Sequence, residues 1–406
     1  MTQRKLRLGV AGLGRAFSVM LPTLSADPRV ELVAGADPRA EARHRFGADF
    51  GARTYASVEE LCADDRVEAV YVATPHQFHP DHVAIATRHG RHVLVEKPMA
   101  LTIADCSAMI EAAETARVQL VVGHSHSFDA PIRRTREIVE SGTVGAVRMI
   151  TAFNYTDFLY RPRRPEELVT AQGGGVIFNQ AAHQIDIVRL LGGGRVRSVR
   201  AATGAWDAAR PTEGAYTAML IFEDGAFASV VYSGYAHFDS DEMCGWISEM
   251  GQAKDPTAYG AARKMLQGVS SPEEETALRN ARGYGAAAAP SPVRAGSKAA
   301  SHQHFGVVVV SCEGADLRPL PNGVMIYDDA AARLEPLPPP DVPRSEVIDE
   351  LYDAIVGNRA PVHDGAWALA TTEVCLAVLQ SAREQKEVFL QHQVAPARQE
   401  RQGVRP

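Results

Sequence analysis

Apolar and polar positions follow a repeating order over the first 125 residues of the chain. Short runs rich in Val, Ala and Leu each end at a turn or polar residue, and stretches of helical periodicity separate them. This alternation is typical of βαβ units, which build a doubly wound parallel sheet with helices on both faces. We therefore predict an α/β domain over residues 1–126. The predicted strands are 6–13, 30–37, 69–75, 92–98 and 119–125, and the predicted helices are 38–50, 80–89 and 103–116.

The pattern changes after residue 128, where strands follow one another with few helices between them. Asp224-Gly225 between two of these runs is a strong hairpin signal. Consecutive strands predict a large, open, mainly antiparallel sheet in an α+β domain over residues 127–394. A long stretch rich in Ala, Gly, Ser and Pro interrupts this domain at about 239–300, and a polar tail covers 395–406. The predicted strands are 147–155, 196–204, 216–222 and 227–235, and the predicted closing helices are 346–356 and 367–386.

Composition and charge restrict the classes of function. A chain of 406 residues exceeds one ordinary core, which agrees with two domains. The formal net charge of −7 does not favour a nucleic-acid partner, and no apolar run reaches the roughly 20 residues that cross a bilayer. Cysteines without CxxC spacing fit reduced thiols, and no histidine group is completed to a tetrahedral metal site. We expect a soluble, cytoplasmic protein with a small-molecule substrate and with no metal, nucleic-acid or membrane partner.

A glycine-rich turn follows the first predicted strand. It stands between a strand and a helix, which is the context of a dinucleotide-binding loop. Glycines let the backbone turn tightly and approach a pyrophosphate, whose charge the helix N-terminus favours. Phe17 stands where a third glycine is usual, and an ordinary strand-to-helix turn is the alternative. The residues assigned to this loop are Gly12, Leu13, Gly14, Arg15 and Ala16.

Asp37 ends the second predicted strand. An acid about 20 residues after the glycine loop accepts hydrogen bonds from the ribose 2′-hydroxyl of NAD and repels the 2′-phosphate of NADP. Arg39, two residues further on, is placed to pair with such a phosphate. The sequence therefore favours NAD and leaves NADP open, and a helix N-cap ahead of Pro38 is the structural alternative for Asp37.

Two further strand ends bring polar groups to the same edge of the sheet. Residues 73–75, followed by His79, end the third strand, where they can face the nicotinamide ribose. Residues 96–98 end the fourth, and ligands of doubly wound sheets gather at such carboxyl ends. We therefore expect Lys97 in the cleft. Its ammonium can hydrogen-bond the oxygen of a reacting alcohol, and burial can bring its pKa towards neutrality.

A histidine in the second half of the chain is the candidate partner of Lys97. His183 has Asn179 four residues before it and Asp186 three residues after it, so that the three share one face of a helix. A neutral imidazole can accept a hydroxyl proton, and Asp186 can orient that imidazole. Glycines 173–175 allow the backbone to approach a ligand. A histidine that serves only the core is the alternative.

Three arginines precede those glycines. Guanidinium groups beside a cleft bind carboxylates through paired hydrogen bonds, so these side chains are candidates for the recognition of a dicarboxylate. Ion pairing at the surface with Glu166 and Glu167 is the alternative. The three are Arg161, Arg163 and Arg164.

At these residues the chain resembles the Gfo/Idh/MocA family of glucose-fructose oxidoreductases and inositol dehydrogenases. The resemblance covers about residues 6–390. It implies an N-terminal Rossmann domain, a C-terminal domain whose open sheet forms a homodimer or homotetramer, and an NAD(P)-dependent dehydrogenase with Lys97 and His183 as the catalytic pair. The motifs that carry it are the glycine loop, Asp37, 73–75 with His79, 96–98, Gly123-His124 and 173–186.

One position departs from the best-known members, which carry aspartate where this chain has Asn179. An amide can hydrogen-bond a substrate but cannot take its proton, so acid–base work falls to Lys97 and His183. We expect cofactor contacts at Gly12, Leu13, Gly14, Arg15, Ala16, Asp37, Arg39, Ala73, Thr74, Pro75, His79, Glu96 and Lys97, and substrate contacts at His124, Arg161, Arg163, Arg164, Asn179 and His183.

Segments 157–186 and 237–256 look like the branch of the family that contains phthalate 4,5-dihydrodiol dehydrogenases. This resemblance implies oxidation of a secondary alcohol on a cyclic substrate such as an aromatic cis-dihydrodiol carboxylate. Lys97 is then expected to contact the reacting oxygen and His183 to take its proton. A sugar or inositol dehydrogenase is one alternative. The other is a non-catalytic dinucleotide-binding regulator, which the presence of both Lys97 and His183 disfavours.

Overall fold

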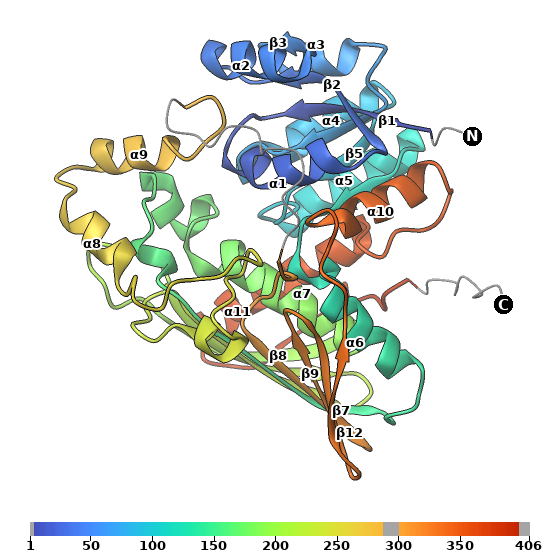
Figure 1. Cartoon of the computed structure of the whole chain (residues 1–406), viewed down its shortest axis with the longest axis vertical. Coiled ribbons are helices and arrows are strands. Elements are labelled where there is room, and N and C mark those ends of the chain that lie inside the picture. Colours follow the sequence, from blue (N-terminus) through green and yellow to red (C-terminus); the bar gives the residue numbers. More distant parts are fainter. Residues whose placement is uncertain (1–3, 287–299, 398–406) are drawn as a thin grey trace.

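The computed structural model describes residues 4–286 and 300–397 of the chain, which form two packed domains (Figure 1). The first holds a six-stranded sheet in the order β3-β2-β1-β4-β5-β6, and every neighbouring pair is parallel. The predicted doubly wound sheet is confirmed. Its strands are β1 Leu6–Ala11, β2 Val30–Ala36, β3 Arg53–Tyr55, β4 Ala69–Val72, β5 His92–Val95 and β6 Leu120–Val122, and its helices are α1 Arg15–Ala26, α2 Ala40–Phe50, α3 Val58–Ala63, α4 His79–Arg88 and α5 Ile103–Ala116.

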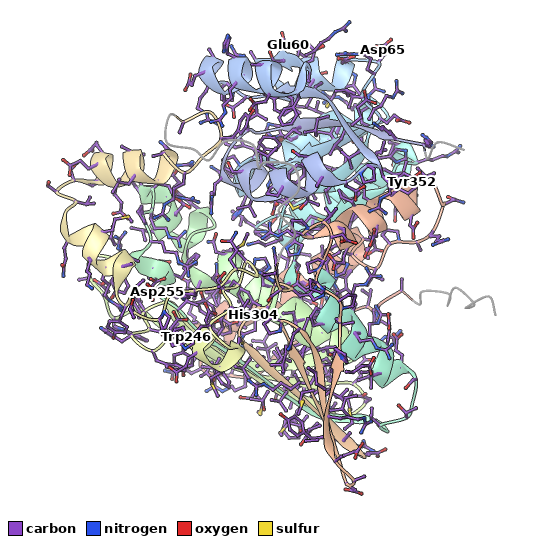
Figure 2. All side chains as sticks on the ribbon, viewed as in Figure 1. Glu60, Asp65, Trp246, Asp255, His304 and Tyr352 are labelled. Atoms are coloured by element: carbon purple, nitrogen blue, oxygen red, sulfur yellow. The ribbon has the colours of Figure 1, made fainter. Side chains whose placement is uncertain are left out.

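Helices cover both faces of this sheet, which is why its strands are apolar throughout. On one face α1 and α2 are joined by α10 (Ser345–Ile355), and on the other α3, α4 and α5 are joined by the start of α11 (Gly365–Glu384). The helix α10 lies within the range that the sequence assigns to the second domain, yet its apolar residues pack on the first. Its Tyr352 hydroxyl donates to the Arg4 carbonyl oxygen at 2.9 Å (Figure 2).

Two short elements of the first domain, β3 and α3, were not among the predicted ones. Three and six residues are too few for a hydrophobic period to show. The signal that marks α3 is its cap instead. The Ser57 side chain accepts the Glu60 N–H, and the Glu60 side chain accepts the Ser57 N–H, which forms a capping box.

The second domain holds a nine-stranded sheet in the order β14-β13-β12-β11-β7-β10-β9-β8-β15. Only β7 and β10 are parallel neighbours, so the prediction of a mainly antiparallel sheet is confirmed. The strands are β7 Val147–Tyr155, β8 Val196–Gly204, β9 Ala215–Phe222, β10 Phe227–Ser233, β11 Val307–Cys312, β12 Ala315–Leu320, β13 Gly323–Asp328, β14 Ala332–Pro336 and β15 Val388–Phe389, and the helices besides α10 and α11 are α6 Ala130–Glu140, α7 Ala182–Leu191, α8 Ala261–Gln267 and α9 Pro272–Asn280.

One face of the second sheet forms its core, and the other is open. Helices α6, α7 and α11 supply the apolar side chains that cover the core face. In β9 the residues alternate strictly, with Leu220 buried and its neighbour Met219 exposed. Of the predicted tail, residues 395–397 are described, and Arg136 donates to the Ala397 carbonyl oxygen at 2.9 Å; residues 398–406 lie outside the described part.

The insert at 239–300 carries helices α8 and α9, which lie along one side of the molecule and lead from the second domain towards α1 (Figure 1). After α9, Tyr284 is buried in the first domain, 1% exposed, with its ring centroid 5.0 Å from that of Phe17. Phe17 occupies the position where the third glycine is usual. The departure from the glycine pattern therefore builds part of a socket for the insert. Residues 287–299 of the insert lie outside the described part of the chain.

Candidate active site

The glycine loop joins β1 to α1 at the carboxyl edge of the first sheet. Gly12 has φ +93°, and a Cβ there would lie 2.9 Å from the Ala73 carbonyl oxygen. Only glycine therefore lets the loop pass so close to the end of the neighbouring strand β4. Gly14 begins α1 without a side-chain cap and has nothing within 4 Å of its Cβ position. The uncapped N–H groups of the first turn, which includes Arg15 and Ala16, and the open space beside them suit a pyrophosphate.

Asp37 follows β2 and is only 5% exposed. Its Oδ2 accepts the Leu13 N–H at 2.9 Å, and its Oδ1 accepts from Arg39 Nε at 2.9 Å. The carboxylate therefore holds the glycine loop in place and neutralises Arg39. The N-cap residue of α2 is Arg39, which has no side-chain cap, and Asp37 Oδ1 accepts the Arg39 N–H at 2.9 Å just ahead of the helix.

The third strand end is braced by a histidine. His79 is fully buried, with Nε2 2.9 Å from the Thr74 carbonyl oxygen and Nδ1 3.1 Å from the Pro98 carbonyl oxygen. It therefore joins the loop of Ala73, Thr74 and Pro75 to the loop after β5. Both ring nitrogens face backbone carbonyls and the ring is enclosed, so the structure shows His79 bonded to the protein, and its contact with a cofactor stays a prediction. His79 positions the two loops.

Lys97 is the second residue after β5, and its Nζ donates to the Asn179 backbone carbonyl oxygen of the second domain at 2.8 Å. Burial lowers the pKa of Lys97 to about 8, although the Glu96 carboxylate opposes part of this effect. Glu96 itself accepts the hydroxyl of the buried Tyr71 at 2.5 Å, which engages it with the core of the first domain. Lys97 thus brings to the domain boundary an amine that can lose its proton at mildly alkaline pH.

Asn179 lies in a π-helical turn, Ile177–Ala181, and not in the regular α-helix that the sequence suggested. Its side-chain nitrogen donates to the carbonyl oxygens of Gly173 at 2.9 Å and of Gly175 at 2.8 Å. Both amide donors are thereby committed within the protein and fix the glycine segment. The backbone carbonyl oxygen of Asn179 in this widened turn accepts the hydrogen bond from Lys97. Such π-helical turns are frequent at functional sites.

His183 stands in the first turn of α7 and is 8% exposed, and its Nδ1 is buried without a hydrogen-bond partner among the described residues. Burial and the charge of Lys97 lower its pKa well below the usual value, so the imidazole is neutral at physiological pH. The rings of His126 and Phe305 lie 4.8 and 5.0 Å from it, centroid to centroid. Neither His126 nor Phe305 was named from the sequence as a neighbour of His183. The signal that could have pointed to His126 is Asp129, three residues after it, and the two side chains lie 2.7 Å apart.

His124 and Asp186 have partners other than His183. His124 is buried, with Nε2 3.2 Å from Asp129 Oδ1. Asp186 accepts from Trp367 Nε1 at 2.6 Å and from Thr371 Oγ1 at 2.8 Å. It therefore binds α7 to α11 and does not orient His183, contrary to the expectation from their spacing.

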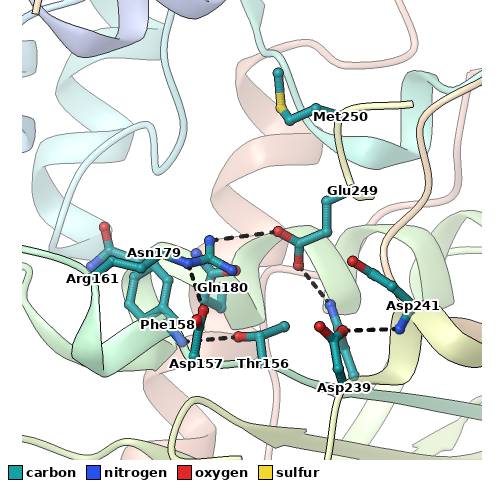
Figure 3. Close-up of polar contacts among 12 residues, drawn as sticks. Thr156, Asp157, Phe158, Arg161, Asn179, Gln180, Asp239, Asp241, Glu249 and Met250 are labelled. Carbon is teal, nitrogen blue, oxygen red and sulfur yellow. Dashed lines mark hydrogen bonds and ion pairs between the residues drawn. The ribbon is translucent and has the colours of Figure 1, made fainter. Parts of the chain in front are cut away.

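Arg161 lies in the segment after β7 and carries two acidic neighbours. Its Nε donates to Asp157 Oδ1 at 3.0 Å, and its Nη1 lies 3.8 Å from Glu249 Oε2 (Figure 3). Glu249 also accepts from Asn154 Nδ2 at 2.9 Å, and its charge acts on Lys97 as well. Glu249 was not predicted as a site residue, because only the folding of the insert brings it beside Arg161.

The other two predicted arginines are engaged by the protein. Arg163 is buried, its guanidinium stacks 3.6 Å over the Phe158 ring, and its Nη2 donates to the Phe158 carbonyl oxygen at 2.7 Å. Arg164 donates from Nε to Asn280 Oδ1 at 3.2 Å and lies 3.8 Å from Glu166. For Arg164 the structure therefore agrees with the alternative stated above, an ion pair at the surface.

Among residues 4–286 and 300–397, no helix is long and apolar enough to span a membrane. Within the same residues, no group of three His, Cys, Asp or Glu side chains is placed to hold a metal ion.

A glycine loop and a lysine thus lie at strand ends of one sheet edge, and the lysine reaches the turn ahead of a helical histidine in the second domain. The description "oxidoreductase family, NAD-binding Rossmann fold" matches residues 6–124, and "GFO/IDH/MocA C-terminal domain" matches residues 132–248. The chain belongs to the Gfo/Idh/MocA family. It is an NAD(P)-dependent oxidoreductase, and its cofactor is a nicotinamide dinucleotide.

Individual relatives agree with this assignment. The chain is 49% identical to a 1-carboxy-3-chloro-3,4-dihydroxycyclohexa-1,5-diene dehydrogenase of Comamonas testosteroni, over 93% of this chain and 95% of that protein. A crystal structure from Bordetella bronchiseptica RB50 superimposes with a TM-score of 0.89 at 46% identity, covering 95% of this chain and all of that one. A myo-inositol 2-dehydrogenase of Thermotoga maritima is 29% identical over 48% of this chain and 57% of its own length.

Proposed function

We propose that this family member is an NAD-dependent dehydrogenase that oxidises a carboxylated cis-dihydrodiol of a six-membered ring. The observation that carries the proposal is the position of Lys97, whose ammonium lies 2.8 Å from the Asn179 carbonyl oxygen and near enough to His183 to lower that histidine's pKa. The name of the Comamonas relative, a carboxylated dihydroxycyclohexadiene dehydrogenase, supports the substrate class.

Lys97 is the proton acceptor in this proposal. A base works best when its pKa lies near the working pH, and burial brings the pKa of Lys97 to about 8. The pKa of His183 is far lower, so its neutral ring hydrogen-bonds the reacting hydroxyl and leaves the proton to Lys97. The sequence had suggested the opposite division of roles. A bound nicotinamide would supply the acceptor for the hydride that leaves the carbon bearing this hydroxyl.

Loss of a hydride and a proton converts one ring carbinol into a ketone. The neighbouring carbon still carries a hydroxyl group and a hydrogen atom, and migration of that hydrogen to oxygen yields an aromatic catechol. Aromatisation makes the overall oxidation favourable. The chain has to supply only binding, orientation and one proton acceptor.

NAD is the form of the cofactor that the loop favours. The Asp37 carboxylate stands where the adenosine ribose is bound in Rossmann folds, and it repels a 2′-phosphate. Arg39 donates to that carboxylate at 2.9 Å and is already neutralised. Arg39 is therefore not available to pair with the 2′-phosphate of NADP.

Arg161 is the proposed contact for the substrate carboxylate. Its separation of 3.8 Å from Glu249 is longer than a charge-assisted hydrogen bond. A ligand carboxylate can therefore form a shorter, bidentate pair with the same guanidinium. Arg163 and Arg164 have protein partners instead, as described above.

A substrate panel tests the proposal through the absorbance of the NADH formed. We expect kcat/KM for a carboxylated dihydrodiol to exceed that for the same diol without the carboxylate by about tenfold or more, the value of one charge-assisted contact. Faster turnover of myo-inositol, the substrate in the name of the Thermotoga relative, would replace the proposal with a polyol dehydrogenase. Intact NADH binding without turnover of any compound would favour the alternative function, a non-catalytic dinucleotide-binding regulator.

We also propose that the open face of the nine-stranded sheet joins copies of the chain into a homodimer or homotetramer. Met149, Met219 and Phe227 are exposed on adjacent strands β7, β9 and β10, and apolar patches on an uncovered sheet mark interfaces. Light scattering on the purified protein should therefore give a mass above that of one chain. Met219→Glu should shift the mass towards the monomer, and a monomeric wild type would exclude this interface.

A further inference from the structure

The insert brings a short segment onto the glycine loop. We call residues 279–286 the strap, because they pass from α9 at the wall of the second domain to the first domain. A Cβ at Gly283 would lie 3.9 Å from the Gly14 carbonyl carbon and 4.0 Å from the Arg15 nitrogen. The strap therefore reaches the start of α1, where the uncapped N–H groups lie.

Side-chain and backbone contacts fix the strap in this position. The Tyr284 hydroxyl donates to Asp49 Oδ2 at 2.6 Å, and its ring is enclosed against Phe17. Arg39 donates to the Tyr284 carbonyl oxygen at 3.5 Å, which connects the strap to the residues expected at the ribose. A Cβ at Gly285 would lie 2.8 Å from Ala42 Cα, so the strap also lies close against α2. These contacts are all with the cofactor side of the cleft.

Two arginines at the strap, Arg15 and Arg282, lack a hydrogen-bonded carboxylate within the described residues, and only the more distant Asp157 opposes the lowering of the Arg282 pKa. The polar contact of Arg282 is Met265 Sδ at 3.5 Å. Arg279, by contrast, donates to Glu167 at 2.8 Å. Burial lowers the pKa of Arg15 and of Arg282, and neighbouring arginines lower both further. An anion between these groups would relieve the crowding of like charges.

We propose that Arg282 is a cofactor-binding residue, which together with Arg15 holds the dinucleotide pyrophosphate against the N-terminus of α1. The pyrophosphate carries two negative charges, and the helix N-terminus and two guanidinium groups are complementary to them. The second domain would then contribute to the cofactor site through its insert. This inference rests on the proposed function only in requiring a bound dinucleotide.

Titration of NADH fluorescence against the full-length protein tests the inference without turnover. Arg282→Gln should raise the NADH Kd about tenfold, which corresponds to about 1.4 kcal/mol. Tyr284→Ala should raise it as well, because the strap loses its anchor. Lys264→Gln is the matched control, since it removes one positive charge from an exposed position in α8 of the same insert and should leave the Kd unchanged. Circular dichroism checks that each variant is folded.

The possible outcomes distinguish a failure of the inference about Arg282 from a failure of the proposed function. An unchanged NADH Kd in folded Arg282→Gln, with a raised KM for the carboxylated dihydrodiol, would move Arg282 to the substrate and overturn the inference. Equal weakening by Lys264→Gln would reduce the effect to overall charge and also overturn it. Failure of the wild type to bind NADH would instead contradict the proposed function itself.

Discussion

The two walls of the cleft are built in different ways. In the first domain, Gly12, Asp37 and Lys97 follow β1, β2 and β5, so a regular parallel sheet sets their positions. In the second, Arg161 and Arg282 lie in irregular segments, and their surroundings depend on contacts between distant parts of the chain. We infer that the first wall supplies the cofactor loop and the proton acceptor, and that the second supplies His183 from α7 and the contacts that adjust which molecules are accepted. Substitutions in the two walls should therefore differ in kind as well as in size.

Lys97→Ala, in the first wall, should have the largest effect. We expect kcat/KM to fall by about 10³-fold, because the variant lacks the proton acceptor, while the NADH Kd stays within about twofold. Steady-state rates and NADH titration measure the two quantities separately. Lys386→Ala, at an exposed lysine, is the control. Equal losses of turnover and cofactor affinity in Lys97→Ala would show that the lysine is structural.

His183→Gln should have the next largest effect. The variant loses the imidazole that orients the hydroxyl group, and we expect kcat to fall about 10²-fold at unchanged NADH affinity. His89→Gln, a substitution far from the cleft at a histidine paired with Glu59, should leave kcat unchanged. If His183→Gln lost more activity than Lys97→Ala, the role of proton acceptor would pass to the histidine.

Asp37→Ser should alter the choice of cofactor rather than the chemical step. The substitution removes the charge that repels a 2′-phosphate and frees Arg39, so we expect the NAD-to-NADP ratio of kcat/KM to fall about thirtyfold, or about 2 kcal/mol. Paired assays with the two cofactors give this ratio. An unchanged ratio would mean that Asp37 serves the glycine loop alone, through its bond from Leu13.

Arg161→Gln, in the second wall, should have the smallest of these effects. We expect KM for a carboxylated substrate to rise about tenfold, with no change for the uncarboxylated diol. Arg164→Gln is matched to it in chemistry, but its guanidinium is engaged with Asn280 and Glu166, so it should change neither KM. Equal rises for both substrates in Arg161→Gln would remove the carboxylate contact from the account.

The contrast between the walls also explains what could be predicted from sequence. Alternating apolar runs located the first sheet, and motif spacing located Lys97 at its edge, because both depend on neighbours in the chain. The long strands β7 and β8 matched their predicted ranges for the same reason. The bonds of Asp186 to Trp367 and Thr371 could not be foreseen, since they join α7 to α11.

Two further features lay outside the reach of the sequence patterns. The π-turn at Asn179 inserts into what has the period of an ordinary helix, and the hydrogen bonds of its side chain to the glycine segment decide its shape. Phe17 was noted as a departure from the glycine pattern. Its reason appears only with the strap in place, because Tyr284 packs against it from the far end of the insert.

The pH dependence of kcat/KM for the wild-type enzyme tests the central claim most directly, because that claim is that neutral Lys97 accepts the substrate proton. Burial lowers the pKa of Lys97 to about 8, so the neutral fraction grows as the pH rises towards that value. The pKa of His183 is lowered far enough that it stays neutral over the same range. We predict that kcat/KM for oxidation rises with pH and levels off above about 8. A profile that falls above about 8 would show that the ammonium form is the active one and would contradict the assignment.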